Sequence, residues 1–251
     1  MKIKKIQKKN NKYKILLEDD TIIETYDEVI IKENILYKKE INEDLKNKIE
    51  QQNKYYETYN NILKYIKTKL RSEYEIRNHI RKNEIDKDKE EEIIKKLKSA
   101  KIIDDKAYTY AYIHDRIKFS NDGPYKIKNE LLKQKIDENI IEEELNKIDQ
   151  KEIYEKLKKQ ILKKLKTNKK YSSNMIKQKL INYFTNQGYE RQMIIEIIDN
   201  NQTTNNKIIK KEYDKLYNKL QNKYNEYELE KIIKQKLYQK GFSIDEINNI
   251  N

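Results

Sequence analysis

One short signature, Ile76-Arg77-Asn78-x-Ile80, returns three times: Ile127-Lys128-Asn129-x-Leu131, Ile176-Lys177-Gln178-x-Leu180 and Ile233-Lys234-Gln235-x-Leu237. Successive copies begin 51, 49 and 57 residues apart. Because residues four apart share one side of a helix, each copy predicts a helix with one apolar face. A near-constant period of this length is typical of tandem units that bury their apolar faces by stacking. The sequence therefore predicts a row of helical repeats, which favours an extended binding surface over a pocket.

Around each copy, apolar spacing predicts two further helices, so we expect three helices in each repeat. The predicted fold class is mainly all-α, with tandem three-helix repeats in an elongated array behind a small β-rich N-terminal domain. That domain, residues 1–50, contains three β-prone runs separated by polar turn residues, and a short helix near 26–31. We place the repeats at 59–103, 104–149, 150–199 and 207–251, with linkers at 51–58 and 200–206.

Capping signals mark several predicted helix ends. Ser72-x-x-Glu75 is a capping box, and Pro124 after Gly123 suits the first turn of a helix. Gly188 and Gly241 follow the third and fourth signature helices, where a left-handed residue commonly ends a helix. Glu84 and Lys135 occupy this place in the first two repeats, so we expect those turns to be built differently or strained. The other predicted caps are Asp86, Asp104, Asp105, Asp137, Asn225 and Ser243.

The composition is highly charged and basic. Only 36% of residues are hydrophobic and 39% are charged, which suits thin helical modules that share a modest core. The net charge of +13 favours a polyanionic partner, with nucleic acid ahead of a membrane surface. Joint over-use of Lys, Asn, Ile and Tyr is also typical of AT-rich coding, which raises charge without functional demand. With no Cys, no signal peptide and no apolar run able to span a bilayer, we expect a cytoplasmic protein without disulfides.

Little in the sequence indicates catalysis. His79 and His114 are the only histidines, and no nucleophile, phosphate-binding or zinc motif surrounds them. The acidic runs Glu90–Glu92 and Glu142–Glu144 are contiguous on predicted helices, so their carboxylates fan outward and we interpret them as solvated faces. We predict no enzymatic activity, no metal site and no cofactor.

Basic helix faces are the candidate binding sites. Arg77 and Arg81 share a helix face, and a guanidinium suits phosphate or carboxylate. One such face per repeat would track a phosphate backbone or an acidic groove without reading sequence. The alternative is that these are ordinary exposed positions in a lysine-rich chain. The candidate partner- or DNA-binding residues are Arg71, Arg77, Arg81, Arg116, Lys126, Lys128, Lys133, Lys177 and Lys179.

The ordered motifs resemble the RecX family, regulators of the bacterial recombinase RecA. The resemblance rests on a set of motifs spanning roughly residues 59–149, and the third and fourth repeats extend it more weakly to the C-terminus. Glu84 and Lys135 stand where the family usually has Gly, and Gln134 replaces a usual basic residue, which puts local loop shape and that contact in doubt. The motifs are Arg71-Ser72-Glu73-x-Glu75-Ile76, Lys96-Leu97, Ile103-Asp104-Asp105-x-x-Tyr108, Arg116, Gly123-Pro124-x-x-Ile127-x-x-Glu130-Leu131 and Ile136.

The resemblance implies a chain of three-helix repeats that lies along the groove of RecA nucleoprotein filaments. It implies restraint of strand exchange, ATP hydrolysis and co-protease activity, and hence a place in homologous recombination, DNA repair and the SOS response. Family members often bind DNA themselves, so single- or double-stranded DNA without strong sequence preference is a second expected partner. We expect no membrane partner, and a monomer. The β-rich start looks like the extra N-terminal segment of longer members.

Two other classes of function stay open at this point. A helix-turn-helix-like DNA-binding regulator would show sequence preference, because it reads base edges. A helical-repeat scaffold with only a protein partner would keep its binding at high salt.

Overall fold

A computed structural model describes residues 1–10, 12–83, 85–167, 171–201 and 206–250. It divides into two compact units, 1–108 and 109–251, and helix α5 (Asp105–Phe119) contains the boundary between them. Among the described residues, no helix combines the length and the apolar character needed to cross a membrane.

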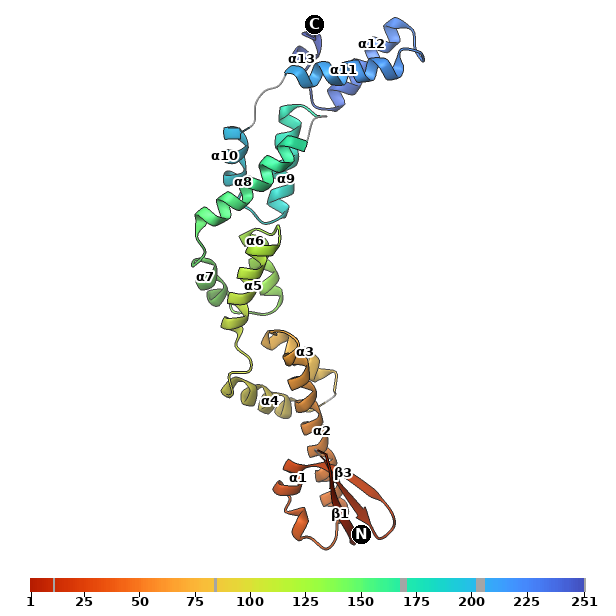
Figure 1. Ribbon diagram of the computed structural model, residues 1–251, viewed down its shortest axis with the longest axis vertical. Coiled ribbons are helices and arrows are strands. Elements are labelled where there is room, and N and C mark those ends of the chain that lie inside the picture. The colour runs from red at the N-terminus through yellow and green to blue at the C-terminus, as the bar shows by residue number, and fades with distance from the viewer. Residues whose placement is uncertain (11, 84, 168–170, 202–205, 251) are drawn as a thin grey trace. The chain divides into compact units, whose positions relative to one another are not determined.

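The first unit begins with a three-stranded antiparallel sheet, as predicted (Figure 1). Strands β1 (Ile3–Lys9), β2 (Lys12–Leu17) and β3 (Ile22–Tyr26) lie in chain order. Alternate residues point to one face of a strand, so Ile15 and Leu17 share the buried face of β2. The remaining residues of this core are Ile23 of β3, Ile41, and residues of helix α1 (Asp27–Lys32), the 3-10 helix η1 (Ile35–Tyr37) and the start of helix α2 (Glu43–Lys67).

Helix α2 belongs to two hydrophobic cores, which corrects the predicted linker at 51–58. Leu45 and Ile49 pack in the core of the sheet, whereas Tyr55 and Ile62 pack in the core of the first repeat. Residues 51–58 are helical throughout and lie inside this single helix. The sheet domain and the first repeat are therefore joined by a continuous helix.

The first repeat is completed by helices α3 (Glu73–Arg81) and α4 (Lys87–Ser99). The predicted capping box is present: Glu75 N donates to Ser72 Oγ at 3.1 Å, and Ser72 N donates to Glu75 Oε2 at 3.2 Å. Asp86 stands at the N-cap of α4, as predicted, although its side chain accepts no capping hydrogen bond. Asp104 does cap α5, by accepting from Lys106 N and Ala107 N.

The helices that follow α4 fall into three more sets of three, and the predicted fold class is confirmed. We call the sets repeats 2, 3 and 4, and the set of α3, α4 and the second half of α2 repeat 1. Of the predicted linker 200–206, residues 202–205 lie outside the described residues, and Asn201 and Asn206 are helical. Repeat 2 contains α5, α6 (Pro124–Lys133) and α7 (Glu138–Leu145), repeat 3 contains α8 (Gln150–Thr167), α9 (Ser173–Asn186) and α10 (Arg191–Asn201), and repeat 4 contains α11 (Asn206–Leu220), α12 (Glu226–Gln239) and α13 (Ile244–Asn248).

Left-handed turns end the second helix of repeats 2, 3 and 4. Gly188 and Gly241 have φ values of 86° and 85°, as predicted, and Lys135 adopts φ 58° at the equivalent point. After α9, Tyr189 N donates to Phe184 O and Gly188 N donates to Thr185 O, which is the Schellman arrangement. Lys135 takes part in the same pattern, so this turn has the Schellman geometry with a strained, side-chain-bearing residue in place of glycine. Glu84 lies outside the described residues.

The N-termini of α6 and α9 each dock on a turn of the next repeat. Gly123 N donates to Gln187 O at 2.6 Å, and Tyr125 N donates to Gly188 O at 3.1 Å. A Cβ on Gly123 would lie 2.5 Å from Gly188 C, so only glycine permits this approach. In the same way, Ser172 N at the start of α9 donates to Lys240 O at 3.1 Å. The glycines that the sequence marks as caps therefore also form the junctions between repeats.

Candidate functional site

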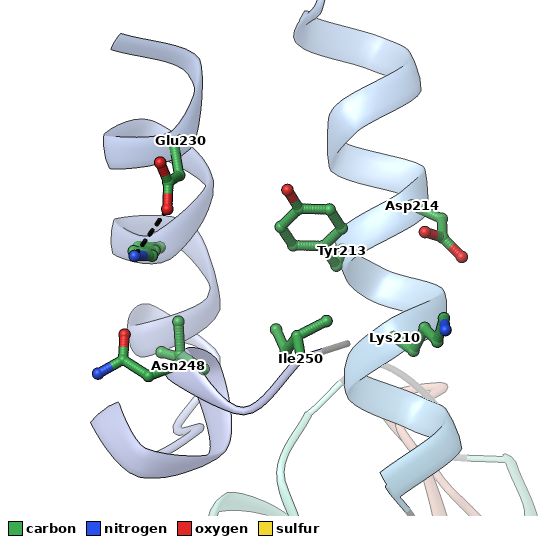
Figure 2. A pocket seen from close by; sticks show the side chains of 8 residues that line it. Lys210, Tyr213, Asp214, Glu230, Asn248 and Ile250 are labelled. Atoms are coloured by element: carbon green, nitrogen blue, oxygen red, sulfur yellow. Dashed lines mark ion pairs between the residues drawn. The ribbon is translucent and has the colours of Figure 1, made fainter. Parts of the chain in front are cut away.

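One pocket lies in repeat 4, and its lining includes both apolar and charged side chains. It has a volume of about 280 Å³ and lies between α11, α12 and the C-terminal residues (Figure 2). Tyr213 and Ile250 give it an apolar floor, while its charged residues include the ion pair of Lys234 Nζ with Glu230 Oε1 at 2.8 Å. Neither histidine belongs to its lining, and within the described ranges no group of His, Asp or Glu side chains could hold a metal ion. None of the nine predicted binding residues lines this pocket.

Arg77 and Arg81, the first predicted binding pair, lie in an ion-pair network inside repeat 1. The Arg77 guanidinium contacts Glu90 at 3.0 Å and Glu91 at 2.5 Å, both on α4, and Glu73 at 2.7 Å on its own helix. Arg81 contacts Glu90 at 3.1 Å. The Glu90 side chain is only 7% exposed, so the solvated face predicted for Glu90–Glu92 is wrong at this residue. Arg77 is thus placed to hold α3 against α4.

The electrostatics of this network favour the charged state of both partners. Burial raises the pKa of Glu90, but hydrogen bonds from Arg81 and Arg77 outweigh it and hold that pKa below 4.5. The hydrogen bond to Glu91 likewise raises the pKa of Arg77, against the opposing effect of burial. Any anionic partner that approached Arg77 would compete with three carboxylates already in place.

The equivalent lysines of repeats 2 and 3 repeat this pairing. Lys128 Nζ contacts Glu138 at 2.6 Å and Glu142 at 2.7 Å on α7, and these hydrogen bonds raise its pKa to about 12. Lys177 Nζ contacts Asp199 on α10 at 2.5 Å. In repeats 1, 2 and 3, the basic residue of the signature therefore links the second helix to the third. This structural role explains its recurrence without a ligand.

Arg71 lies in a compact cluster at the start of α3. Its guanidinium lies over the Tyr65 ring at 3.9 Å and contacts Glu75 at 3.2 Å, and only 13% of the side chain is exposed. The His79 ring stacks on the same Tyr65 ring, with 4.1 Å between the ring centroids. Burial lowers the pKa of His79, with Lys82 and Arg71 adding to the shift. The cluster packs the end of α2 against α3.

Arg116 and Lys126 converge on one buried carboxylate in repeat 2. Lys126 Nζ lies 2.6 Å and Arg116 Nη1 lies 3.4 Å from the carboxylate of Asp122. Arg116 also contacts Glu130 at 3.4 Å. Lys156 on α8 donates to the carbonyl oxygens of Arg116 and Asp122 at 3.3 Å, and burial lowers its pKa. The hydrogen bonds of Lys156 therefore connect α8 of repeat 3 to repeat 2.

Two of the nine predicted residues have no carboxylate partner within the described ranges. Lys133 is exposed on α6, and Lys179 Nζ lies over the Tyr171 ring at 3.2 Å. The exposed lysines of α8 are not among the predicted binding residues, although a helix with seven Lys and two Glu is a visible signal in the sequence. We take the unpaired basic residues of repeat 3 as the candidate site.

Comparisons with known proteins agree on one family. A sequence profile described as the second three-helix domain of RecX matches residues 104–145. A protein named Regulatory protein RecX from Streptococcus agalactiae serotype III (strain NEM316) is 30% identical over 254 residues, covering 99% of this chain and 98% of that protein. One of the same name from Oceanobacillus iheyensis is 30% identical over 253 residues, covering 96% and 93%. A crystal structure of regulatory protein RecX superposes with a TM-score of 0.69 at 26% identity, over 79% of this chain and 98% of that one.

Proposed function

The chain belongs to the RecX family, and on this premise we propose that it is a non-enzymatic regulator that binds RecA filaments on DNA and inhibits them. The observation that carries the proposal is its 30% identity to a protein named Regulatory protein RecX along nearly the full length of both chains. The expected consequences are restraint of RecA's ATP hydrolysis, strand exchange and co-protease activity. We place it in the cytoplasm, where the recombinase works, and expect it to act as a monomer.

The architecture is consistent with a filament as the partner. Successive three-helix repeats present their surfaces module by module, which suits a partner that is itself a repeating polymer. The junctions of Gly123 with Gly188 and of Ser172 with Lys240 connect neighbouring repeats by backbone hydrogen bonds. Several repeats can then act together on several subunits of a filament.

The same junctions weigh against a helix-turn-helix regulator. In such proteins the N-terminal residues of the recognition helix contact base edges in the major groove. Here the N-termini of α6 and α9 are docked on the next repeat through Gly123 and Ser172. We therefore favour DNA contacts that do not read sequence.

The proposal is tested by titrating the purified protein into RecA that hydrolyses ATP on single-stranded DNA. We expect inhibition at well below one molecule per RecA monomer, because one molecule bound to a filament affects many subunits. Strand exchange should fall in parallel. Unchanged hydrolysis and strand exchange at an equimolar ratio would reject the proposal, and sequence-dependent DNA binding in that case would favour the regulator class.

A further inference from the structure

The positive charge of the chain is concentrated in one repeat. Residues 150–199 contain twelve Lys and Arg and five Asp and Glu, a net charge of +7, whereas residues 104–149 contain eight and eleven, a net charge of −3. Residues 59–103 and 207–251 carry +5 and +3. More than half of the formal excess of +13 therefore lies within one fifth of the chain.

Helix α8 displays part of this charge as a regular stripe. Lys159, Lys163 and Lys166 are spaced i, i+4 and i+7, so they share one face of the helix, and all three are exposed. The opposite face holds Leu157 and Ile161, which are fully buried in the repeat. At a rise of 1.5 Å per residue the stripe spans about 10 Å. Of the carboxylates that the structure describes, none pairs with these three lysines.

Two other lysines of repeat 3 contact tyrosine rings. Lys164 of α8 reaches across to α9 and lies over the Tyr183 ring at 3.9 Å. Lys179 of α9 lies over the Tyr171 ring at 3.2 Å. Helix α9 itself contains no Asp or Glu. Two further ammonium groups are thus held in place by aromatic rings, which leave their positive charge uncompensated.

We propose that this stripe on α8, formed by Lys159, Lys163 and Lys166, is where the chain binds the phosphate backbone of nucleic acid. The inference deepens the DNA-binding part of the proposed function and rests on it. A phosphate that reaches α8 displaces only mobile counterions, whereas a phosphate at Arg77 must compete with Glu90 and two other carboxylates. The stripe offers ammonium groups alone, so it contacts phosphates and does not stack bases. It therefore binds without sequence preference.

Repeat 4 offers a stripe of similar spacing in different surroundings. Lys211, Lys215 and Lys219 are exposed on α11 at i, i+4 and i+8. Helix α12, which packs against α11, contains Glu226, Glu228 and Glu230, and Asp214 lies on α11 itself. Those carboxylates lower the local positive potential and would repel phosphate. This stripe is therefore a matched control. Replacing its three lysines removes the same charge as replacing those of α8, but should affect binding to nucleic acid much less.

The test compares two triple variants of the full chain in binding to a fluorescently labelled oligothymidylate. Lys159→Gln with Lys163→Gln and Lys166→Gln should weaken binding at least tenfold. It should also lower the slope of log affinity against log salt by about 2, since each lost phosphate contact on a single strand contributes about 0.7. Lys211→Gln with Lys215→Gln and Lys219→Gln should change affinity less than threefold. All six side chains are exposed, so we expect both variants to fold as the natural chain does. Circular dichroism of each variant checks this.

The outcomes separate this inference from the proposed function. Equal losses in both triple variants, or no loss in the α8 variant, would overturn the inference. If the α8 variant binds oligothymidylate normally but no longer inhibits RecA, the surface contacts RecA protein, which also overturns it while leaving the proposed function intact. If the natural chain binds oligothymidylate through α8 but never inhibits RecA, the proposed function fails and the inference stands.

Discussion

Repeats 1 and 3 contain almost the same number of basic residues, thirteen in 59–103 and twelve in 150–199, yet they expose different amounts of unpaired charge. In repeat 1, Arg77 and Arg81 are held by carboxylates of the same repeat. In the described part of repeat 3, Lys177 with Asp199 is the one ion pair, and the lysines of α8 have no carboxylate partner. A count of basic residues therefore does not locate a binding surface, because the fold decides which charges it neutralises itself.

The largest expected difference between the two repeats is in their stability at acidic pH. Burial raises the pKa values of Glu73, Glu90 and Glu91, but the ion pairs with Lys98, Arg81 and Arg77 hold these pKa values below their ordinary 4.5. Their contribution to stability is complete above the unfolded-state pKa and is lost as the pH falls through the lower folded-state values. As the pH is reduced below about 4.5, repeat 1 should unfold before repeat 3.

Backbone amide NMR signals assigned to each repeat would measure this order. The comparison is controlled internally, because full protonation of the carboxylates leaves repeats 1 and 3 with nearly equal numbers of positive charges. Loss of the α9 and α10 signals before those of α3 and α4 would contradict the assigned role of the ion pairs.

Much of the fold could be predicted from local sequence signals. Capping residues act within one helical turn, so Ser72 with Glu75 and the left-handed Gly188 and Gly241 were readable directly. The error at residues 51–58 has a different origin. There the helix passes from one core to another between Ile49 and Tyr55, so the apolar pattern changes while the helix continues.

The second prediction concerns the junction that positions repeat 3. Gly188→Val would place a Cβ 2.3 Å from Lys126 N and force a β-branched residue to φ 86°. The left-handed conformation costs about 1–2 kcal/mol and the overlap about 1–3 more, so we expect about 3 kcal/mol of destabilisation in urea unfolding. Gly241→Val is the matched control: it has the same left-handed φ, but the nearest atoms to its Cβ would be Met175 Cβ at 2.7 Å and Ser172 Oγ at 2.8 Å rather than backbone atoms, so we expect a smaller loss. An equal loss at both positions would show that left-handed geometry alone matters.

The candidate site was less predictable than the fold. The sequence placed Arg77 and Arg81 on one face of α3, and they do share it. It could not show that Glu90, nine to thirteen residues further along the chain, packs against that face, because this depends on the angle between α3 and α4. The lysine content of α8 is visible in the sequence. Whether those lysines form ion pairs depends on how the helices pack, which the sequence does not show.

The smallest effect, and the sharpest, is expected from the arginines of repeat 1. Arg77→Ala removes contacts to Glu73, Glu90 and Glu91, and leaves a nearly buried Glu90 with Arg81 as its remaining arginine. Removing one member of a fully buried ion pair costs about 3–5 kcal/mol, and Arg77 is 20% exposed, so we expect about 2 kcal/mol in urea unfolding.

Arg81→Ala is the matched control for this variant, since its side chain is 59% exposed and it contacts Glu90 alone. It should destabilise the repeat distinctly less than Arg77→Ala, because solvent already screens that pair. Neither substitution should reduce oligothymidylate binding as much as the α8 triple variant does, since neither side chain is available to a phosphate without leaving its carboxylate. If Arg77→Ala kept its urea midpoint and weakened DNA binding tenfold, the contrast between the repeats would be reversed. The signature arginine would then bind the partner, and its ion pairs with carboxylates would not stabilise the repeat.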